Sequence, residues 1–145
     1  MSGDLVLRPL PRPTSHSAPF WSATTEGRFL IQRCTSCDQA SFYPRVNCPA
    51  CGSLELSNED ASGRATVFTY TIARRPTHSA FADAGPSIIA IVELEEGPHV
   101  TTNIIDCDPA EVSIGMAVEV TFADEIDGIA LPLFRPALAP SDGNA

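Results

Sequence analysis

Apolar and polar residues alternate in five short runs along the second half of the chain. The runs span Ala65–Ala73, Ser87–Leu94, Val100–Ile105, Ala117–Phe122 and Gly128–Phe134. Within the first run, Phe68, Tyr70 and Ile72 fall on one face of an extended strand and their neighbours on the other. Gly-Pro, Asp-Pro and Asp-Gly pairs between the runs are typical of turns. Five short strands at this spacing predict a small antiparallel barrel or sandwich.

The segment between the third and fourth runs narrows this choice. Asp108–Val112 leaves room for about one helical turn. An OB-fold places a helix at this point of its strand order. The pattern is therefore compatible with an OB-like barrel.

The first part of the chain shows a different pattern. Residues 1–16 contain three prolines and no hydrophobic period, which indicates a flexible arm. Ser17 is placed to cap a short helix that runs through Pro19 to Glu26 and ends at Gly27. Phe20 and Trp21 would anchor this helix, and core packing is favoured over contact with a partner.

Two C-x2-C pairs, separated by ten residues, follow a predicted strand over Arg28–Arg33. The pairs are Cys34 with Cys37 and Cys48 with Cys51. Each pair can present two thiolates from a tight turn, and two such turns complete the tetrahedron that Zn²⁺ prefers. We interpret the four cysteines as a closed, structural zinc site with one ion per chain.

Disulfide, redox and iron chemistry also use cysteine thiols. A disulfide framework needs an oxidising compartment, and no secretory leader opens the sequence. A thioredoxin-like redox pair accounts for one C-x2-C but not two. An iron site uses the same four thiolates, so the sequence does not distinguish iron from zinc.

These patterns predict a mainly β fold in which a short helix and a zinc ribbon precede a five-stranded, OB-like antiparallel barrel. Ser41–Tyr43 is expected to return along the first strand, and the polar stretch Ser53–Gly63 to turn into the second unit. The expected division is a flexible arm at 1–16, helix plus ribbon at 17–60, the barrel at 61–137 and a tail at 138–145.

Charge is unevenly distributed over the 145 residues. The net charge is −9, and all nine basic residues are Arg. Residues 1–75 carry +2 and residues 76–145 carry −11. Such an acidic chain repels nucleic-acid phosphates, so we expect no nucleic-acid partner. The longest apolar run, Ser87–Val92, is too short to span a bilayer, so we expect a cytoplasmic protein without membrane contact.

Candidate catalytic residues are sparse. Cys107 lies between two aspartates, which raise a thiol pKa, and a buried inert thiol is the favoured interpretation. The three histidines fall in no catalytic motif, so we expect no catalysis by this chain alone. Arg74, Arg75 and Phe81 follow the first barrel strand and could contact a phosphate-bearing ligand such as a nucleotide or coenzyme A. A solvated basic loop or an ion pair with a partner is the simpler interpretation of these residues.

Several segments together carry a family resemblance. They are Phe20-Trp21 with Gly27-Arg28-Phe29, the four cysteines with Pro44, Gly63–Thr71, and Ile114–Val118 leading to Leu131–Pro136. With these segments the chain resembles the rubredoxin-like zinc-ribbon plus OB-fold acyl-CoA-associated proteins, over about residues 17–137. Carried over by position, the four cysteines match the metal ligands of that family.

The resemblance implies a non-catalytic subunit of a hetero-oligomer. Such proteins accompany thiolase-fold enzymes that perform acyl transfer, thiolysis or retro-aldol cleavage of CoA thioesters, including steroid side chains. The chain is then expected to hold acyl-CoA or to complete the partner's active site. Two alternative functions belong to other classes of protein. One is a nucleic-acid-binding zinc ribbon with an OB-fold, and the other is a small enzyme that uses Cys107 or His78.

Overall fold

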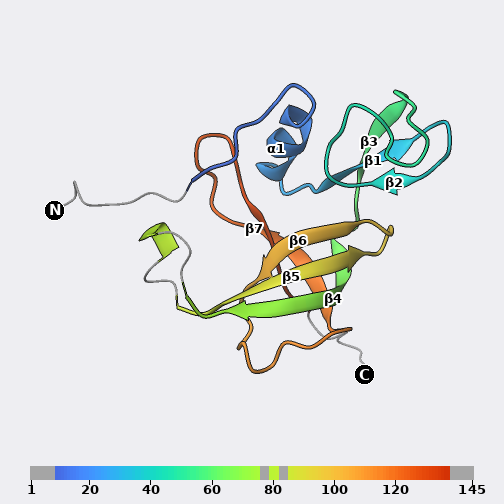
Figure 1. Ribbon diagram of the computed structural model, residues 1–145. Coiled ribbons are helices and arrows are strands. Elements are labelled where there is room, and N and C mark those ends of the chain that lie inside the picture. Colours follow the sequence, from blue (N-terminus) through green and yellow to red (C-terminus); the bar gives the residue numbers. More distant parts are fainter. Residues whose placement is uncertain (1–8, 76–78, 82–84, 138–145) are drawn as a thin grey trace.

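The computed structural model describes residues 9–75, 79–81 and 85–137, and within them it contains one α-helix, a three-stranded sheet and a closed five-stranded barrel. Figure 1 shows the helix and the three-stranded sheet side by side above the barrel. The predicted mainly β fold, with a short helix and a cysteine-bearing ribbon before a five-stranded barrel, is confirmed. Residues 1–8 of the arm expected at 1–16, and the tail expected at 138–145, lie outside the described residues.

Helix α1 spans Ala18–Thr24 and is shorter than the sequence predicted. Ser17 occupies the N-cap position, but its hydroxyl makes no capping bond and instead accepts a hydrogen bond from the Thr14 amide at 2.8 Å. The helix ends at Thr24, two residues before the predicted Glu26. A turn follows it, in which Gly27 has φ +74° and the amide of Arg28 bonds back to the Ala23 carbonyl. Phe20 is buried in the core, as expected for an anchor of the helix.

The ribbon sheet has the strand order β2-β1-β3. Its strands are β1 (Leu30–Cys34), β2 (Ala40–Ser41) and β3 (Leu56–Asp60), and both pairings are antiparallel. Strand β3 was not predicted: the polar stretch Ser53–Gly63 was expected only to turn into the second unit. It lacks apolar alternation because neither of its faces is buried: all five residues are half-buried or exposed. Arg33 of β1 forms a two-pronged ion pair with Glu59 of this strand.

The barrel has the strand order β4-β5-β6-β8-β7 and closes through β4 and β7. Its strands are β4 (Arg64–Ala73), β5 (Ser87–Leu94), β6 (His99–Ile104), β7 (Ala117–Phe122) and β8 (Pro132–Pro136). One pairing differs from the antiparallel expectation, because β6 and β8 run parallel where Ile104 faces Phe134. A short 3-10 helix, η2 (Ser79–Phe81), lies in the connection between β4 and β5.

The prediction of which β4 side chains share one face is wrong at one end of the strand. The pairing with β5 skips a residue between Val67 and Thr69, which is a β-bulge. Val67 therefore points into the core and is 1% exposed, whereas Phe68 lies outside and is 51% exposed. After the bulge the alternation recovers, and Tyr70 and Ile72 pack against the core as expected.

The segment before β7 also differs from the expected helical turn. Asp108 begins a hydrogen-bonded turn instead: its carboxylate accepts from the Ala110 amide and its carbonyl from the Glu111 amide. Val112, which follows this turn, is buried and belongs to the core cluster. The turn thus supplies an apolar residue to the core without a helix.

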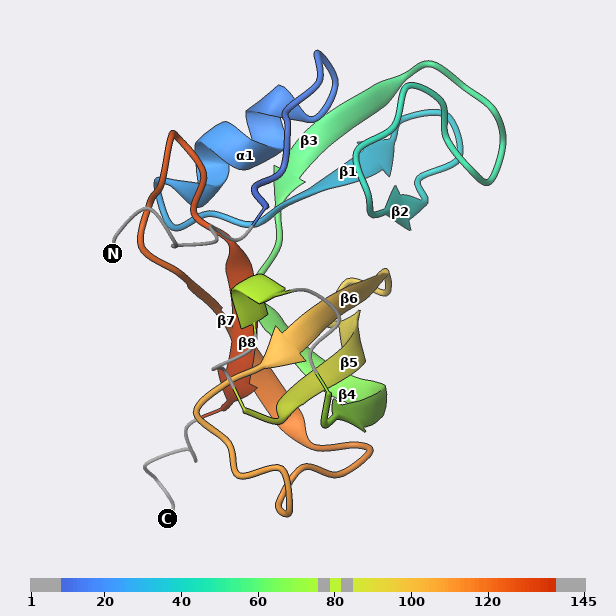
Figure 2. The ribbon, with the colours of Figure 1, turned by 60° about the vertical axis from the view of Figure 1, so that its left-hand side comes forward.

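The helix, ribbon and barrel share one hydrophobic core. Phe20 of α1, Phe29 beside β1 and Phe42 of the ribbon contact one another with ring centroids 5.1 to 5.3 Å apart. The buried Thr24 hydroxyl accepts a hydrogen bond from the Ala130 amide, which fixes α1 to the β7–β8 connection (Figure 2). Within the described part of the chain, no helix has the length and apolar character needed to cross a membrane.

Candidate metal centre and ligand-binding face

Two turns of the ribbon carry the four cysteines in nearly the same backbone conformation. In the first turn the Asp38 amide bonds to the Cys34 carbonyl, and in the second the Gly52 amide bonds to the Cys48 carbonyl. Asp38 and Gly52 both have positive φ, at +66° and +80°. Gly52 adopts this conformation at little cost, and Asp is among the residues that tolerate it.

The two turns bring all four Sγ atoms within 4.8 Å of one another. Cys34 and Cys51 lie 3.6 Å apart by their Sγ atoms, and Cys37 and Cys48 lie 3.7 Å apart. A tetrahedron with Zn–S bonds of about 2.3 Å has sulfur atoms about 3.8 Å apart. The donor set therefore fits a four-coordinate metal ion, as the spacing of the cysteines predicted.

Backbone amides support the thiolate form that a metal needs. The amide of Cys37 points at Cys34 Sγ at 3.4 Å and lowers the pKa of the Cys34 thiol to about 6. The amide of Cys51 likewise lowers the pKa of Cys48. Four thiolates fill a tetrahedral site, so the arrangement favours a structural role over catalysis.

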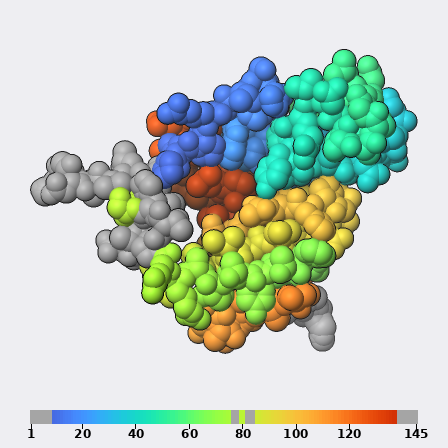
Figure 3. Space-filling model, viewed as in Figure 1, coloured from blue at the N-terminus to red at the C-terminus, as the bar shows by residue number. Residues whose placement is uncertain are grey.

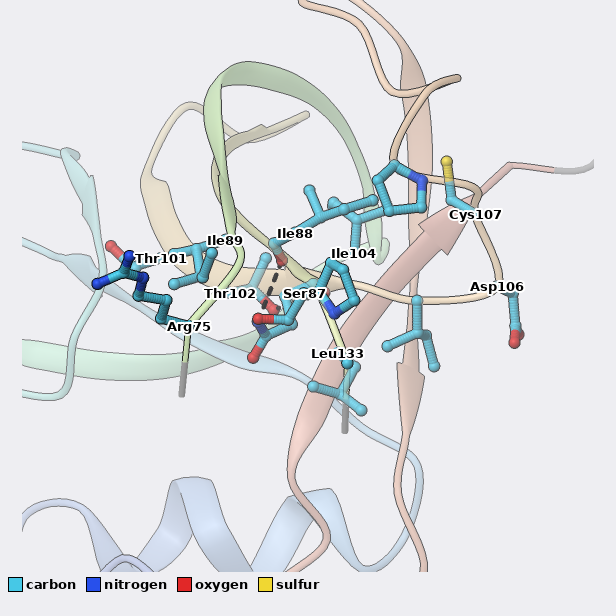
Figure 4. Close-up of a pocket in the computed structure, with 16 residues that line it drawn as sticks. Arg75, Ser87, Ile88, Ile89, Thr101, Thr102, Ile104, Asp106, Cys107 and Leu133 are labelled. Carbon is cyan, nitrogen blue, oxygen red and sulfur yellow. Dashed lines mark hydrogen bonds between the residues drawn. The ribbon is translucent and has the colours of Figure 1, made fainter. Parts of the chain in front are cut away.

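A pocket of about 630 Å³ lies beside β5 and β6, between the β4–β5 connection, the segment that follows β6 and Leu133 of β8 (Figure 4). Figure 3 shows strands β4, β5 and β6 stacked below the ribbon on one face of the molecule. The second and third strands of an OB-fold form its usual ligand face, together with the first loop and the last loop of the barrel. Strands β5 and β6 hold those positions here, so the pocket lies on the face that OB-folds use for binding.

The two ends of the pocket carry opposite charge. Arg75 lies at one end near Thr101, whereas Asp106 and Cys107 lie at the other (Figure 4). Apolar side chains, including Ile89 and Leu133, line the pocket between these ends. A ligand with an anionic head and an apolar body matches this distribution when its head is next to Arg75.

The three residues that the sequence analysis proposed for ligand contact do not share one position in the structure. Arg75 lines the pocket, and Arg74 is exposed and does not line it. Phe81 ends η2, and its side chain lies outside what the structure describes. Their role in binding stays a prediction.

Cys107 is half-buried, not fully buried as expected, and it lines the acidic end of the pocket. Its Sγ lies 3.5 Å from the Asp108 carbonyl. Burial raises the pKa of the Cys107 thiol, and the carboxylates of Glu111 and Asp108 raise it further. These surroundings oppose a reactive thiolate, in line with the interpretation as an inert thiol.

Sequence reasoning missed the polar residues of β6 that face the pocket. Thr101, Thr102 and Asn103 all line it, and the amide of Thr101 also donates to the Tyr43 hydroxyl of the ribbon at 3.4 Å. Their pattern in the sequence is that of an ordinary half-exposed strand. The order of β6 next to β5, combined with the usual ligand face of OB-folds, is the signal that could have identified them.

Two family models match consecutive parts of the chain. Residues 21–57 match "ChsH2, rubredoxin-like zinc ribbon domain", and residues 58–123 match "ChsH2, C-terminal OB-fold domain". A DUF35 domain-containing scaffold protein of Methanothermobacter thermautotrophicus is 41% identical over 91 residues, covering 62% of this chain and 68% of that protein. The chain therefore belongs to the DUF35 family, in which a zinc ribbon precedes an OB-fold.

Two longer relatives carry the names of enzyme subunits. A probable enoyl-CoA hydratase alpha subunit of Thermomonospora curvata is 36% identical over 133 residues, covering 92% of this chain. The 3-oxo-4,17-pregnadiene-20-carboxyl-CoA hydratase alpha subunit of Mycobacterium tuberculosis is 34% identical over 124 residues, covering 83% of this chain. The chain spans 41% and 37% of the lengths of these two proteins.

A solved structure described as an Ltp2-ChsH2(DUF35) aldolase has the same fold. It superposes with a TM-score of 0.78 at 34% identity and covers 89% of this chain and all of that chain. A Sulfolobus solfataricus protein of the DUF35 family, at 13% identity and a TM-score of 0.61, shares the fold.

Proposed function

We propose that this chain is a non-catalytic accessory subunit that binds acyl-CoA, completes the active site of a thiolase-like partner acting on CoA thioesters, or does both. The reaction would be acyl transfer, thiolysis or retro-aldol cleavage, with steroid side chains among the substrates. Two relatives are named as subunits of CoA-thioester hydratases, and another is described as part of an aldolase. Membership of the same family supports a related role.

The observation that carries the proposal is the pocket on the β5–β6 face, with Arg75 at one end. A CoA ester is anionic at its nucleotide and extended along its pantetheine arm. Arg75 would bind a phosphate, and the lining residues of β5 and β6 would contact the arm. The acyl group would then lie toward Asp106 and Cys107, where a partner must supply the chemistry.

One structural zinc ion per chain belongs to the same proposal. Cys34, Cys37, Cys48 and Cys51 would hold it, and its role would be to stabilise the ribbon that packs against the barrel. The ribbon sheet contributes few residues to the core on its own, so the bound metal would supply its rigidity.

Co-expression with thiolase-fold chains from the same genome tests the proposal. A stable complex is expected, and the complex should cleave or transfer a CoA thioester faster than the thiolase-like chain alone. If the complex forms but is no faster than its partner alone, the accessory role is wrong. A cytoplasmic location can be checked in parallel by fractionation of the native cells.

The nucleic-acid alternative has one observation in its favour. The rings of Phe68 and His99 lie on the outside of the barrel with centroids 4.5 Å apart, and exposed rings on an OB-fold can stack on bases. Against it stands the net charge of −11 over residues 76–145. Titration of labelled single strands at low salt separates the two functions, and we expect no binding.

A further inference from the structure

Asn103 lies near the middle of the ligand face, on strand β6. It pairs across the sheet with Ile89 of β5 and lines the pocket together with Thr101. Its Nδ2 donates a hydrogen bond to the Ile88 carbonyl at 3.1 Å. A carbonyl only accepts hydrogen bonds, so this contact fixes which end of the carboxamide is nitrogen.

The same contact leaves the other end of the carboxamide without a protein partner. Asn103 Oδ1 makes no hydrogen bond to any described residue, and it is not among the side-chain atoms sealed away from solvent. The second proton of Nδ2 is also left over, because the Ile88 carbonyl uses one of the two. Asn103 therefore offers an oriented acceptor and a donor beside the pocket.

We propose that Asn103 binds a secondary amide in the extended part of the pocket's ligand. A secondary amide carries one N–H and one carbonyl, which complement the free acceptor and donor of a carboxamide. This inference rests on the proposed function, because the pantetheine arm of CoA contains two secondary amides. The inference names the side chain by which the protein would distinguish the pantetheine arm from a purely apolar chain.

The place of Asn103 along the chain supports this assignment: it follows Thr101, which lies at the Arg75 end, by two residues and precedes Asp106, at the other end, by three. Arg75 lies at one end of the pocket and Asp106 at the other (Figure 4). A ligand anchored at Arg75 by its phosphates therefore passes the β6 residues before it reaches Asp106. Around Asn103 the lining includes the apolar Ile89 and Ile105, and in such surroundings an unpaired ligand amide loses affinity.

Isothermal titration of the full chain with two probes tests the inference. The probes are CoA and adenosine 3′,5′-bisphosphate, which keeps the 3′-phosphate and the first 5′-phosphate of the nucleotide but lacks the second 5′-phosphate and the arm. We expect Asn103→Leu to weaken CoA binding about tenfold, the effect of one well-placed hydrogen bond, and to change bisphosphate binding less than twofold. Thr71→Val is the matched control, since Thr71 lies on the outside of β4 and does not line the pocket.

The outcomes separate this inference from the function on which it rests. If the wild-type chain fails to bind CoA, the ligand part of the proposed function is overturned together with the role of Asn103. If CoA binds equally to the wild type and Asn103→Leu, the role of Asn103 is overturned and the proposed function stands. Equal weakening of both probes in Asn103→Leu indicates a structural role and also overturns it.

A measurement on the wild-type protein removes dependence on the folding of the variant. The side-chain amide signals of Asn103 in a ¹⁵N–¹H spectrum are expected to shift on addition of CoA and to stay in place on addition of the bisphosphate. Shifts of equal size with both probes would contradict contact between Asn103 and the arm.

Discussion

Phe29 of the ribbon unit and Phe134 of the barrel meet edge to face, with ring centroids 6.2 Å apart. Both rings are buried, at 2% and 0% exposure. This contact joins two parts of the chain that the sequence suggested as separate units. We therefore expect the ribbon and the barrel to unfold as one cooperative unit.

Replacement of Phe134 by Ala should therefore destabilise both parts together. Removal of a fully buried phenylalanine costs about 3–5 kcal/mol in unfolding free energy. Phe68→Ala is the control because that ring is 51% exposed, and its cost should stay below about 1 kcal/mol. Urea unfolding followed by the fluorescence of Trp21, beside the ribbon, and by far-ultraviolet circular dichroism should give one coincident transition. Two separate transitions in the wild type would contradict a shared core.

Gly63 stands where the chain enters the barrel and should not tolerate a side chain. Its φ is +87°, and an added Cβ would lie 2.7 Å from Val120 Cγ1. Gly115 has nearly the same φ, +88°, with no atom within 4 Å of an added Cβ. We expect Gly115→Ala to cost about 1 kcal/mol from the backbone alone, and Gly63→Ala about 2–4 kcal/mol because the contact adds to it. Equal melting temperatures of the two variants would show that Val120 moves aside freely.

The metal assignment predicts a clear difference between two cysteine variants. Cys37→Ser should lose the bound ion and unfold at a lower temperature, because a thiolate ligand is removed from a four-coordinate site. Cys107→Ser should keep the ion, since Cys107 lines the pocket and is not one of the four clustered sulfur atoms. Elemental analysis by mass spectrometry measures both. Stoichiometric iron in the wild type, or retention of zinc by Cys37→Ser, would refute a zinc site of four thiolates.

The two adjacent arginines should differ in their effect on CoA binding. Arg75 lines the pocket and Arg74 does not, although both are exposed. Arg75→Ala should weaken CoA about tenfold and flatten the dependence of affinity on salt, because a phosphate contact is lost. Arg74→Ala should change affinity less than about threefold. A larger loss in Arg74→Ala would place the phosphates outside the described pocket.

Local features of the sequence were sufficient to predict the cluster of four cysteines. The two C-x2-C pairs determine which atoms meet, because each pair spans a single turn and Gly52 follows the second. The order of the barrel strands along the chain was also predictable, since alternating residues and turn pairs mark each strand locally. Strand β3 escaped prediction because its polar residues carry no periodic signal, and its pairing with β1 is what makes it a strand.

By itself, the sequence determined the mainly β fold, the four clustered cysteines and an acidic second part of the chain, residues 76–145, with a single basic residue. The tertiary structure alone decided that Phe68 lies outside, because a bulge is defined by the register of two strands and not by one. It likewise decided that Arg75 and Asn103 line one pocket, although 28 positions separate them in the numbering. Such contacts depend on which strands lie side by side, and only the closed barrel fixes that arrangement.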